Sequence, residues 1–318
     1  MSSDLKWTVS TCGPKNFPSE IYRGSLHYGK KEGAPVPNME TRDNGWGVTG
    51  TTYSSNTPKE VPHRLDFVWL SYRENKFYGG SFMLPKAKME NLFEKGYTHI
   101  ANKINEDRKD TYDEILVGVL PEGRLAVWLV GPGFTTQVGF FQGEETDVSF
   151  NDFNPSGIKD RELYVNTLVR QIPAEALAKP IPFGRWETYA KEYSWRPVIQ
   201  GDIVDHVFFE DHYYYNGNKE VFIHQEANNV PLRNRTVPKR ININWARKTD
   251  GYRLESEFEF DEEEMFSVFK ELYTDPKTEQ GELVFKYNAK KDVDIFLKVG
   301  DKQKQLKKVT LGTYKSTY

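Results

Sequence analysis

The chain has 318 residues with a formal net charge of −3, and its sequence pI is about 6.1. This length allows two ordinary domains with a core each, and the mildly acidic balance argues against a nucleic-acid-binding protein. Hydrophobic residues make up only 37% of the chain, but aromatic residues reach 14%. We therefore expect cores filled by Phe, Tyr and Trp side chains, each of which buries ~150–250 Å².

The single cysteine, Cys12, excludes an intramolecular disulfide bond and a zinc site built on cysteines. We expect it to be a small buried side chain in an N-terminal strand. No stretch of about 20 apolar residues occurs, so no helix is expected to cross a membrane. The first residues lack the apolar segment of a signal peptide, which fits either a cytosolic protein or a chain from which a leader was removed.

The first region with a clear pattern spans residues 62–142. Alternating apolar and polar residues predict a hairpin of two strands at 64–72 and 76–84. Pro85 fits the first turn of a helix with one apolar face. The residues of that face are Met89, Leu92, Phe93 and Tyr97. Further strands are expected near 114–120, 124–130 and 135–142, separated by turns rich in Gly and Pro.

The middle of the chain has a different character. Helices are expected at 159–170 and 183–193, in a segment that also contains Pro173, Pro180 and Pro182. A strand pair rich in tyrosine follows near 203–215 and 219–224, turned by Asn216-Gly217-Asn218. We place a domain boundary in this segment, between residues 1–180 and 181–318.

The last region repeats the pattern of the first. Strands are expected near 240–247 and 251–260, and Asp261 is a good N-cap for a helix whose first turn is acidic. The apolar face of this helix is formed by Met265, Val268, Phe269 and Leu272. Strands near 282–288, 292–299 and 303–311 complete the region.

The two patterned regions also align with each other. The stretch Pro62–Trp69 resembles Pro238–Trp245, and the alignment continues without a gap to the two helices. After a small change in length, residues 125–129 match residues 293–297. We therefore predict an α+β fold of two related β-β-α-β-β repeats. In this fold a helix packs on each antiparallel sheet and a helical linker joins the two domains, whose cores span 62–142 and 238–311.

A cluster of acidic and histidine residues suggests a metal site in the tyrosine-rich strand pair. Its members are Asp205, His206, Glu210, Asp211 and His212. On a regular strand His206, Glu210 and His212 share a face, but His206 and His212 would lie roughly 20 Å apart at ~3.3 Å per residue, which is too far for one ion. An exposed polar strand face explains the cluster better, and we expect no metal and no cofactor.

The acidic run from Glu255 to Glu264 also has both a functional and a structural explanation. It could supply calcium ligands or a pair of catalytic carboxylates, but it lacks the spacing of an EF-hand. An alternating solvent face followed by an acidic helix N-terminus explains it. Motifs for a nucleophile elbow, a zinc protease or a dinucleotide site do not occur, so we expect no catalytic residues.

Aromatic residues are the best candidates for binding. Trp46 is flanked by Gly45 and Gly47, and this segment forms either a bend around a buried Trp or an exposed platform for a sugar or a protein partner. The candidate binding residues are Trp46, Trp186, Tyr213, Tyr214 and Tyr215. Burial of Trp46 and Trp186 would argue against stacking on a sugar.

Five ordered stretches together resemble an uncharacterised family of bacterial envelope lipoproteins, the domain of unknown function DUF2931. The stretches are Cys12-Gly13-Pro14-Lys15-Asn16-Phe17-Pro18, Asn44-Gly45-Trp46-Gly47, Arg64-Leu65 with Trp69-Leu70-Ser71-Tyr72, Ala126-Val127-Trp128-Leu129 with Gly131-Pro132-Gly133, and Pro182-Phe183-Gly184-Arg185-Trp186. They follow one another in matching order over nearly the whole chain. The resemblance implies a lipid-anchored protein of the periplasm or cell surface of Gram-negative bacteria, especially Bacteroidetes relatives, and it carries over no catalytic residues.

Two functions are compatible with these observations. The first is a non-enzymatic cell-envelope protein that binds another protein, in its specific form an immunity protein that blocks an interbacterial toxin. The second is a carbohydrate-binding protein that uses exposed aromatic platforms for a polysaccharide. The sequence itself lacks a leader and a lipid-attachment motif, so a cytoplasmic location applies if the chain is genuinely leaderless.

Overall fold

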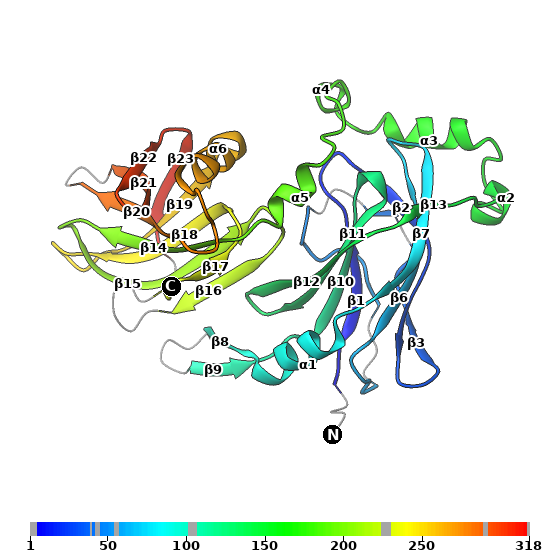
Figure 1. The fold of residues 1–318 in the computed structure, drawn as a ribbon, viewed down its shortest axis with the longest axis horizontal. Coiled ribbons are helices and arrows are strands. Elements are labelled where there is room, and N and C mark those ends of the chain that lie inside the picture. The colour runs from blue at the N-terminus through cyan, green and yellow to red at the C-terminus, as the bar shows by residue number, and fades with distance from the viewer. Residues whose placement is uncertain are drawn as a thin grey trace. The chain divides into compact units, whose positions relative to one another are not determined.

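The computed structural model describes residues 5–38, 40–41, 45–53, 57–100, 107–223, 230–288 and 292–316. The chain divides into two compact units. Unit 1 comprises Met1–Thr98 and Asp107–Phe183, and unit 2 comprises His99–Glu106 and Gly184–Tyr318. Among the described residues, strands account for 49% and helices for 16%, so this part of the protein is mostly β and the predicted α+β class is wrong (Figure 1).

Unit 1 contains two main sheets. Sheet 1A has the order β12-β11-β10-β1-β5, with β1 parallel to β10 and the other pairs antiparallel. Its strands are β1 (Thr8–Cys12), β5 (Thr52–Tyr53), β10 (Glu114–Val119), β11 (Arg124–Gly131) and β12 (Phe134–Gln142). Sheet 1B has the antiparallel order β13-β7-β6-β2-β3, and β4 (Glu40–Thr41) also pairs with β2. Its strands are β2 (Ser19–Tyr28), β3 (Glu32–Pro35), β6 (Arg64–Ser71), β7 (Lys76–Met83) and β13 (Glu144–Glu145). A separate pair is formed by β8 (Tyr97–Ile100) and β9 (Asp107–Asp110).

The main core of unit 1 lies between these sheets. Trp69 of sheet 1B and Val127 of sheet 1A belong to the same buried cluster, which also includes Met89 and Phe93 of α1 (Lys86–Lys95). The predicted helix after Pro85 is thus confirmed, but it ends at Lys95, and Tyr97, predicted for its apolar face, lies in β8. A short 3-10 turn, η1 (Pro121–Gly123), joins β10 to β11.

The other face of sheet 1B is partly covered by helices. Leu70, Tyr72 and Phe77 form a second buried cluster with Val165 of α3 (Arg161–Val169). The hydroxyls of Tyr72 and Tyr164 both donate to the same carboxylate oxygen of Glu20, each at 2.6 Å. The preceding α2 (Phe150–Phe153) contributes to this cover, and α4 (Ala174–Leu177) follows along the chain.

Unit 2 also contains two sheets. Sheet 2A has the order β17-β14-β20-β21-β22, with β14 parallel to β20. Its strands are β14 (Tyr193–Gln200), β17 (Arg233–Arg235), β20 (Gln280–Tyr287), β21 (Val293–Val299) and β22 (Lys302–Leu306). Sheet 2B has the antiparallel order β23-β19-β18-β15-β16. Its strands are β15 (Val204–Tyr214), β16 (Lys219–Ile223), β18 (Pro238–Arg247), β19 (Arg253–Phe260) and β23 (Val309–Lys315). The helices are α5 (Arg185–Tyr189) and α6 (Glu262–Leu272).

The predicted β-β-α-β-β repeat is wrong because its two hairpins belong to different sheets. The hairpin β6–β7 lies in sheet 1B, whereas β10–β11 lies in sheet 1A, and strands from earlier and later in the chain complete both sheets. In unit 2 the hairpin β18–β19 likewise lies in sheet 2B, whereas β20–β21 lies in sheet 2A. The strands of the two units therefore pair in the same order, but what they share is a pair of sheets rather than a four-stranded α+β unit.

A local prediction near the C-terminus also differs from the structure. The single strand predicted at 303–311 is two strands, β22 and β23, which belong to different sheets. The last residue of the strand predicted at 219–224 lies outside the described residues.

Candidate functional site

A hollow of about 690 Å³ opens on the outer face of sheet 1B, beside the part that α2 and α3 cover. Outward-facing residues alternate along β6 with core residues such as Leu65 and Phe67. The hollow is lined by β2, β6 and β7 and by residues 144–146. We call it the sheet 1B groove.

The groove exists because its floor carries small side chains. Ser25, Asp66 and Ser81 are neighbours across β2, β6 and β7, and Val68 lies opposite Gly79. A Cβ atom at Gly79 would lie 2.9 Å from a methyl carbon of Val68 and 3.0 Å from the carbonyl oxygen of Phe67. Any larger residue would therefore disturb this row of the sheet.

One end of the groove is organised around the carboxylate of Asp66. Ser81 donates a hydrogen bond to it at 2.6 Å and Arg64 donates another at 3.2 Å. The Nε2 atom of His27 lies 2.7 Å from its second oxygen. Partial burial opposes ionisation of Asp66, but the hydrogen bond from Ser81 and the charges of Arg64 and His27 outweigh it and hold the pKa of Asp66 below its usual value.

The order of these contacts differs from that of a catalytic triad. In a catalytic triad the histidine lies between the serine and the carboxylate and takes the serine proton. Here Ser81 and His27 both contact Asp66, so the carboxylate lies between them. The cluster can fix a charged surface, but Ser81 does not direct its proton to a histidine.

The two long sides of the groove carry opposite charges. Arg23 on β2, Val68 on β6, Gly79 on β7 and Glu144 on β13 form one row across the sheet. Three strand spacings separate the ends of this row, which is ~14 Å at ~4.8 Å per spacing. An extended polypeptide segment fits this width and can meet a cation on one side and an anion on the other.

The matching face of unit 2 has no small floor of this kind. Asp211, Asn242 and Glu257 are neighbours across sheet 2B in the same way as Ser25, Asp66 and Ser81 are across sheet 1B. Asp211 and Glu257 are longer than Ser25 and Ser81, which hold the matching positions in unit 1. The groove therefore depends on the residues of unit 1 and not on the pairing order alone.

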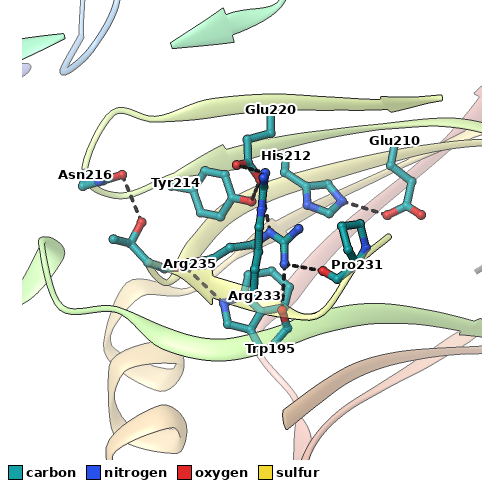
Figure 2. Close-up of polar contacts among 10 residues, drawn as sticks. Trp195, Glu210, His212, Tyr214, Asn216, Glu220, Pro231, Arg233 and Arg235 are labelled. Carbon is teal, nitrogen blue, oxygen red and sulfur yellow. Dashed lines mark hydrogen bonds and ion pairs between the residues drawn. The ribbon is translucent and has the colours of Figure 1, made fainter. Parts of the chain in front are cut away.

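Unit 2 instead contains charged side chains in its interior. Glu220 accepts hydrogen bonds from Tyr214 at 2.6 Å and from Nε of Arg235 at 3.2 Å, and it also pairs with Arg233 (Figure 2). Burial opposes ionisation of Glu220, but the two guanidinium groups outweigh it and lower the pKa of this carboxyl. Arg235 is buried and donates further hydrogen bonds to the carbonyl oxygens of Trp195 and Pro231 at 2.8 and 2.9 Å.

A second buried pair lies beside the first. The Nε2 atom of His212 is 2.7 Å from a carboxylate oxygen of Glu210, and both side chains are buried (Figure 2). The imidazole lies near the rings of Trp195 and Phe222, with ring centroids 6.3 and 4.9 Å away. No surface of His212 is exposed, so we regard this pair as part of the core and not as a binding site.

The candidate binding residues from the sequence are not brought together. Trp186, Tyr214 and Tyr215 are buried and present no exposed ring. Trp46 is half-buried and packs edge-on against Trp128, with ring centroids 4.6 Å apart. Tyr213 is half-buried beneath the guanidinium of Arg240, which lies 4.0 Å from its ring centroid.

The acidic and histidine cluster of β15 is also divided. Glu210 and His212 point into unit 2, and the register of β15 with β18 shifts on both sides of Val207. The regular strand assumed for the sequence is therefore interrupted between His206 and Glu210. Among the residues that the structure describes, no group of three or more His, Cys, Asp or Glu is placed to hold a metal ion.

Two further findings concern Cys12 and the helices. Cys12 is fully buried, and burial raises the pKa of its thiol to about 12. Within the described parts of the chain, no helix has both the length and the apolar character needed to cross a membrane.

The groove residues were not found from the sequence, although one signal was present. Gly79-Gly80-Ser81 places three small residues in the middle of a predicted strand. Glycine within a strand often marks a close approach of another group to the sheet. Sequence alternation could not show that His27, some 40 residues earlier, reaches Asp66, because that contact depends on the pairing of β2 with β6.

The chain was compared with curated proteins, with solved structures and with protein families. No curated protein and no solved structure matches it. The family described as "Protein of unknown function (DUF2931)" matches residues 2–184, a range that ends where unit 2 resumes at Gly184. The chain therefore belongs to the DUF2931 family.

Proposed function

We propose that this protein is a non-catalytic binding protein that captures another protein through the sheet 1B groove. Its specific form in this proposal is an immunity protein of the bacterial cell envelope that blocks an interbacterial toxin. The observation that carries the proposal is the groove itself, an open hollow of about 690 Å³ with a fixed charge pattern on a sheet face.

The groove has the features of a recognition surface. Asp66 is held in place by three neighbours, and Arg23 and Glu144 flank a floor of small residues. A rigid surface with complementary charges provides specificity and a fast encounter with a partner. Blocking a toxin needs no chemistry, only a stable interface of roughly 800 Å² per partner.

The envelope location rests on the resemblance to lipoproteins. The DUF2931 family has no assigned function, so the family match does not identify a partner. Carbohydrate binding has less support, because Trp186, Tyr214 and Tyr215 are buried.

The proposal is tested by filling the groove. Ser81 is exposed on its floor, and Ser81→Trp would place an indole where the partner is expected to lie. Tagged full-length protein should retain one stoichiometric partner from its producing strain, identified by mass spectrometry, and Ser81→Trp should lose it. Gln303→Trp is the matched control, since it adds the same ring at an exposed strand position of unit 2.

The outcomes separate the parts of the proposal. Loss of the partner with Ser81→Trp but not with Gln303→Trp places the interface in the groove. Equal retention by both variants shows that the groove is not the binding site. If the partner is a toxin, wild-type protein should protect a susceptible cell and Ser81→Trp should not; protection by neither protein removes the immunity form.

A further inference from the structure

The strand β23 forms one end of sheet 2B. It pairs with β19 over residues 309–315. Among the described residues, no other strand pairs with β23. Every non-proline residue of a strand carries an N–H and a C=O group that need partners. The open side of β23 therefore presents backbone groups for a further strand.

The register shows which residues of β23 face outward. Ser316 donates a backbone hydrogen bond to Arg253, and Asp261 donates one to Lys308. Since hydrogen-bonded pairs recur at every second residue of an antiparallel ladder, the even-numbered residues of β23 bond to β19. The residues with outward N–H and C=O groups are Val309, Leu311, Thr313 and Lys315.

Five other strands that end one of these sheets are short or carry protective residues. β5 and β13 have two residues each, and β17 has three, of which two are arginines. β22 carries Lys302 and Lys304, and β3 ends in Pro35. Proteins protect sheet edges in these ways against pairing with other chains.

β23 lacks such protection. Its seven residues, VTLGTYK, include no proline and a single charge at the end. Leu311 is 39% exposed and Tyr314 is 60% exposed, on opposite faces of the strand. The ring of Tyr314 lies over Gly312, where a Cβ atom would come within 2.4 Å of the tyrosine oxygen, and it offers an exposed apolar surface beside the edge.

The charge next to β23 indicates what kind of strand would fit. Glu255, Glu257 and Glu259 of β19 lie opposite Tyr314, Gly312 and Thr310 on the outer face. Arg240 lies 3.7 Å from Glu257 and offsets part of this negative charge, and Asp211 adds to it near Glu255. A second copy of this chain would bring the same acidic row, whereas Lys or Arg side chains on an added strand could reach across Thr310 to the glutamates.

We infer that β23 is a docking edge for an extended segment of another protein, which joins sheet 2B as an additional strand and carries Lys or Arg side chains on the face shared with Glu255 and Glu257. The backbone groups of β23 supply affinity and the acidic row supplies specificity, as in other cases of strand addition. This edge lies in unit 2 and does not depend on the sheet 1B groove.

A pair of substitutions at Thr313 tests the inference. Its N–H points away from β19, so Thr313→Pro removes an outward donor and leaves the bonds to β19 in place. Thr313→Val keeps the N–H and the branched side chain shape, and is the matched control. Circular dichroism and thermal unfolding of both full-length variants establish that they are folded.

The probe is a fluorescein-labelled octapeptide that alternates Thr and Lys, followed by anisotropy, with an alternating Thr and Glu octapeptide as the charge control. Wild-type protein and Thr313→Val should bind the Lys peptide saturably, and Thr313→Pro and the Glu peptide should each show affinity weaker by about tenfold or more, equivalent to ~1.4 kcal/mol. Equal binding by the Pro and Val variants, or no saturable binding at millimolar protein, overturns the inference. Dimerisation of the wild-type protein that Thr313→Pro abolishes would assign the edge to a second copy and also overturn it.

Discussion

At the scale of single residues, the two units fill equivalent interior positions with different kinds of side chain. Leu26 and Ala34 are paired neighbours in the interior of unit 1, next to Leu65. The corresponding pair in unit 2 is His212 and Glu220, next to Ile241. Unit 2 thus places polar and charged groups where unit 1 has apolar ones, and these groups are stable in the interior only because Arg235 and Glu210 are there to pair with them.

Glu220→Gln should therefore destabilise unit 2. The substitution leaves the buried guanidinium of Arg235 without its carboxylate, and breaking a buried pair by removing one partner costs on the order of 3 kcal/mol. Urea unfolding should show a lower midpoint with an unchanged slope. Glu282→Gln is the control, since the side chains of Glu282 and Arg196 are 37% and 43% exposed and loss of their pair should change stability by less than about 1 kcal/mol. Equal effects of the two substitutions would contradict this account.

The same carboxylate predicts a pH dependence. The pKa of Glu220 is lowered in the folded protein, so its stabilising contribution is fully present above the unfolded pKa of about 4.3 and is lost as the pH falls through the folded pKa. The stability difference between wild-type protein and Glu220→Gln should thus shrink below about pH 4. Unfolding titrations at several pH values would show it, and a difference that stays constant to pH 3 would contradict it.

The candidate site shows how much of a binding site can be predicted from the sequence alone. Alternation correctly placed Asp66 and Ser81 on strands, but it could not bring them together with His27. The aromatic candidates were selected for their type, and Trp186 and Tyr215 are buried because large rings are also what a core needs. The local sequence does not distinguish an aromatic side chain that binds a partner from one that fills a core.

At the scale of elements, local signals predicted boundaries well. Asp261 caps α6, and its side chain accepts a hydrogen bond from the N–H of Glu264 at 2.9 Å, as its position before an acidic turn suggested. The hairpins at β6–β7 and β18–β19 are also confirmed. These elements depend on contacts between residues close in sequence, which is why a periodic pattern reveals them.

Asp261→Ala should lower the free energy of unfolding by about 1 kcal/mol, because the N–H of Glu264 loses its partner at the helix end. Chemical denaturation with a far-ultraviolet signal is the measurement. Glu263→Ala is the control, as Glu263 is exposed in the same turn and should contribute only a few tenths of a kcal/mol through the helix dipole. If both substitutions have the same effect, the cap is not responsible.

Sheet membership was not predictable at this scale. β1 and β14 each join a sheet through a parallel partner far along the chain, and no local pattern indicates a parallel pair between distant strands. The adjacent strands β22 and β23 were merged because Lys307 and Lys308, which separate them, continue a polar stretch. The fold class was therefore misjudged even where most individual strands were found.

At the scale of the whole molecule, unit 1 has its own two sheets, core and helical cover. Residues 1–183 should therefore fold alone, with a cooperative urea transition and a near-ultraviolet signal from the Trp46–Trp128 pair. Residues 1–160 are the control, because they lack α3 and expose Leu70, Tyr72 and Phe77. A fragment 1–183 without a cooperative transition would show that unit 1 needs the rest of the chain.

The parallel strands have a consequence for how the chain is made. Thr8 bonds to Asp113, a residue 105 positions later, so the first strand leaves the ribosome long before its neighbour β10 exists. During translation β1 must wait for β10 while about a hundred residues are added, which takes on the order of 5–20 s at ~5–20 residues per second. Unit 1 can close its core only once β10 to β12 have emerged. This interval, rather than any weakness of the finished fold, is when a chaperone would have the most to protect.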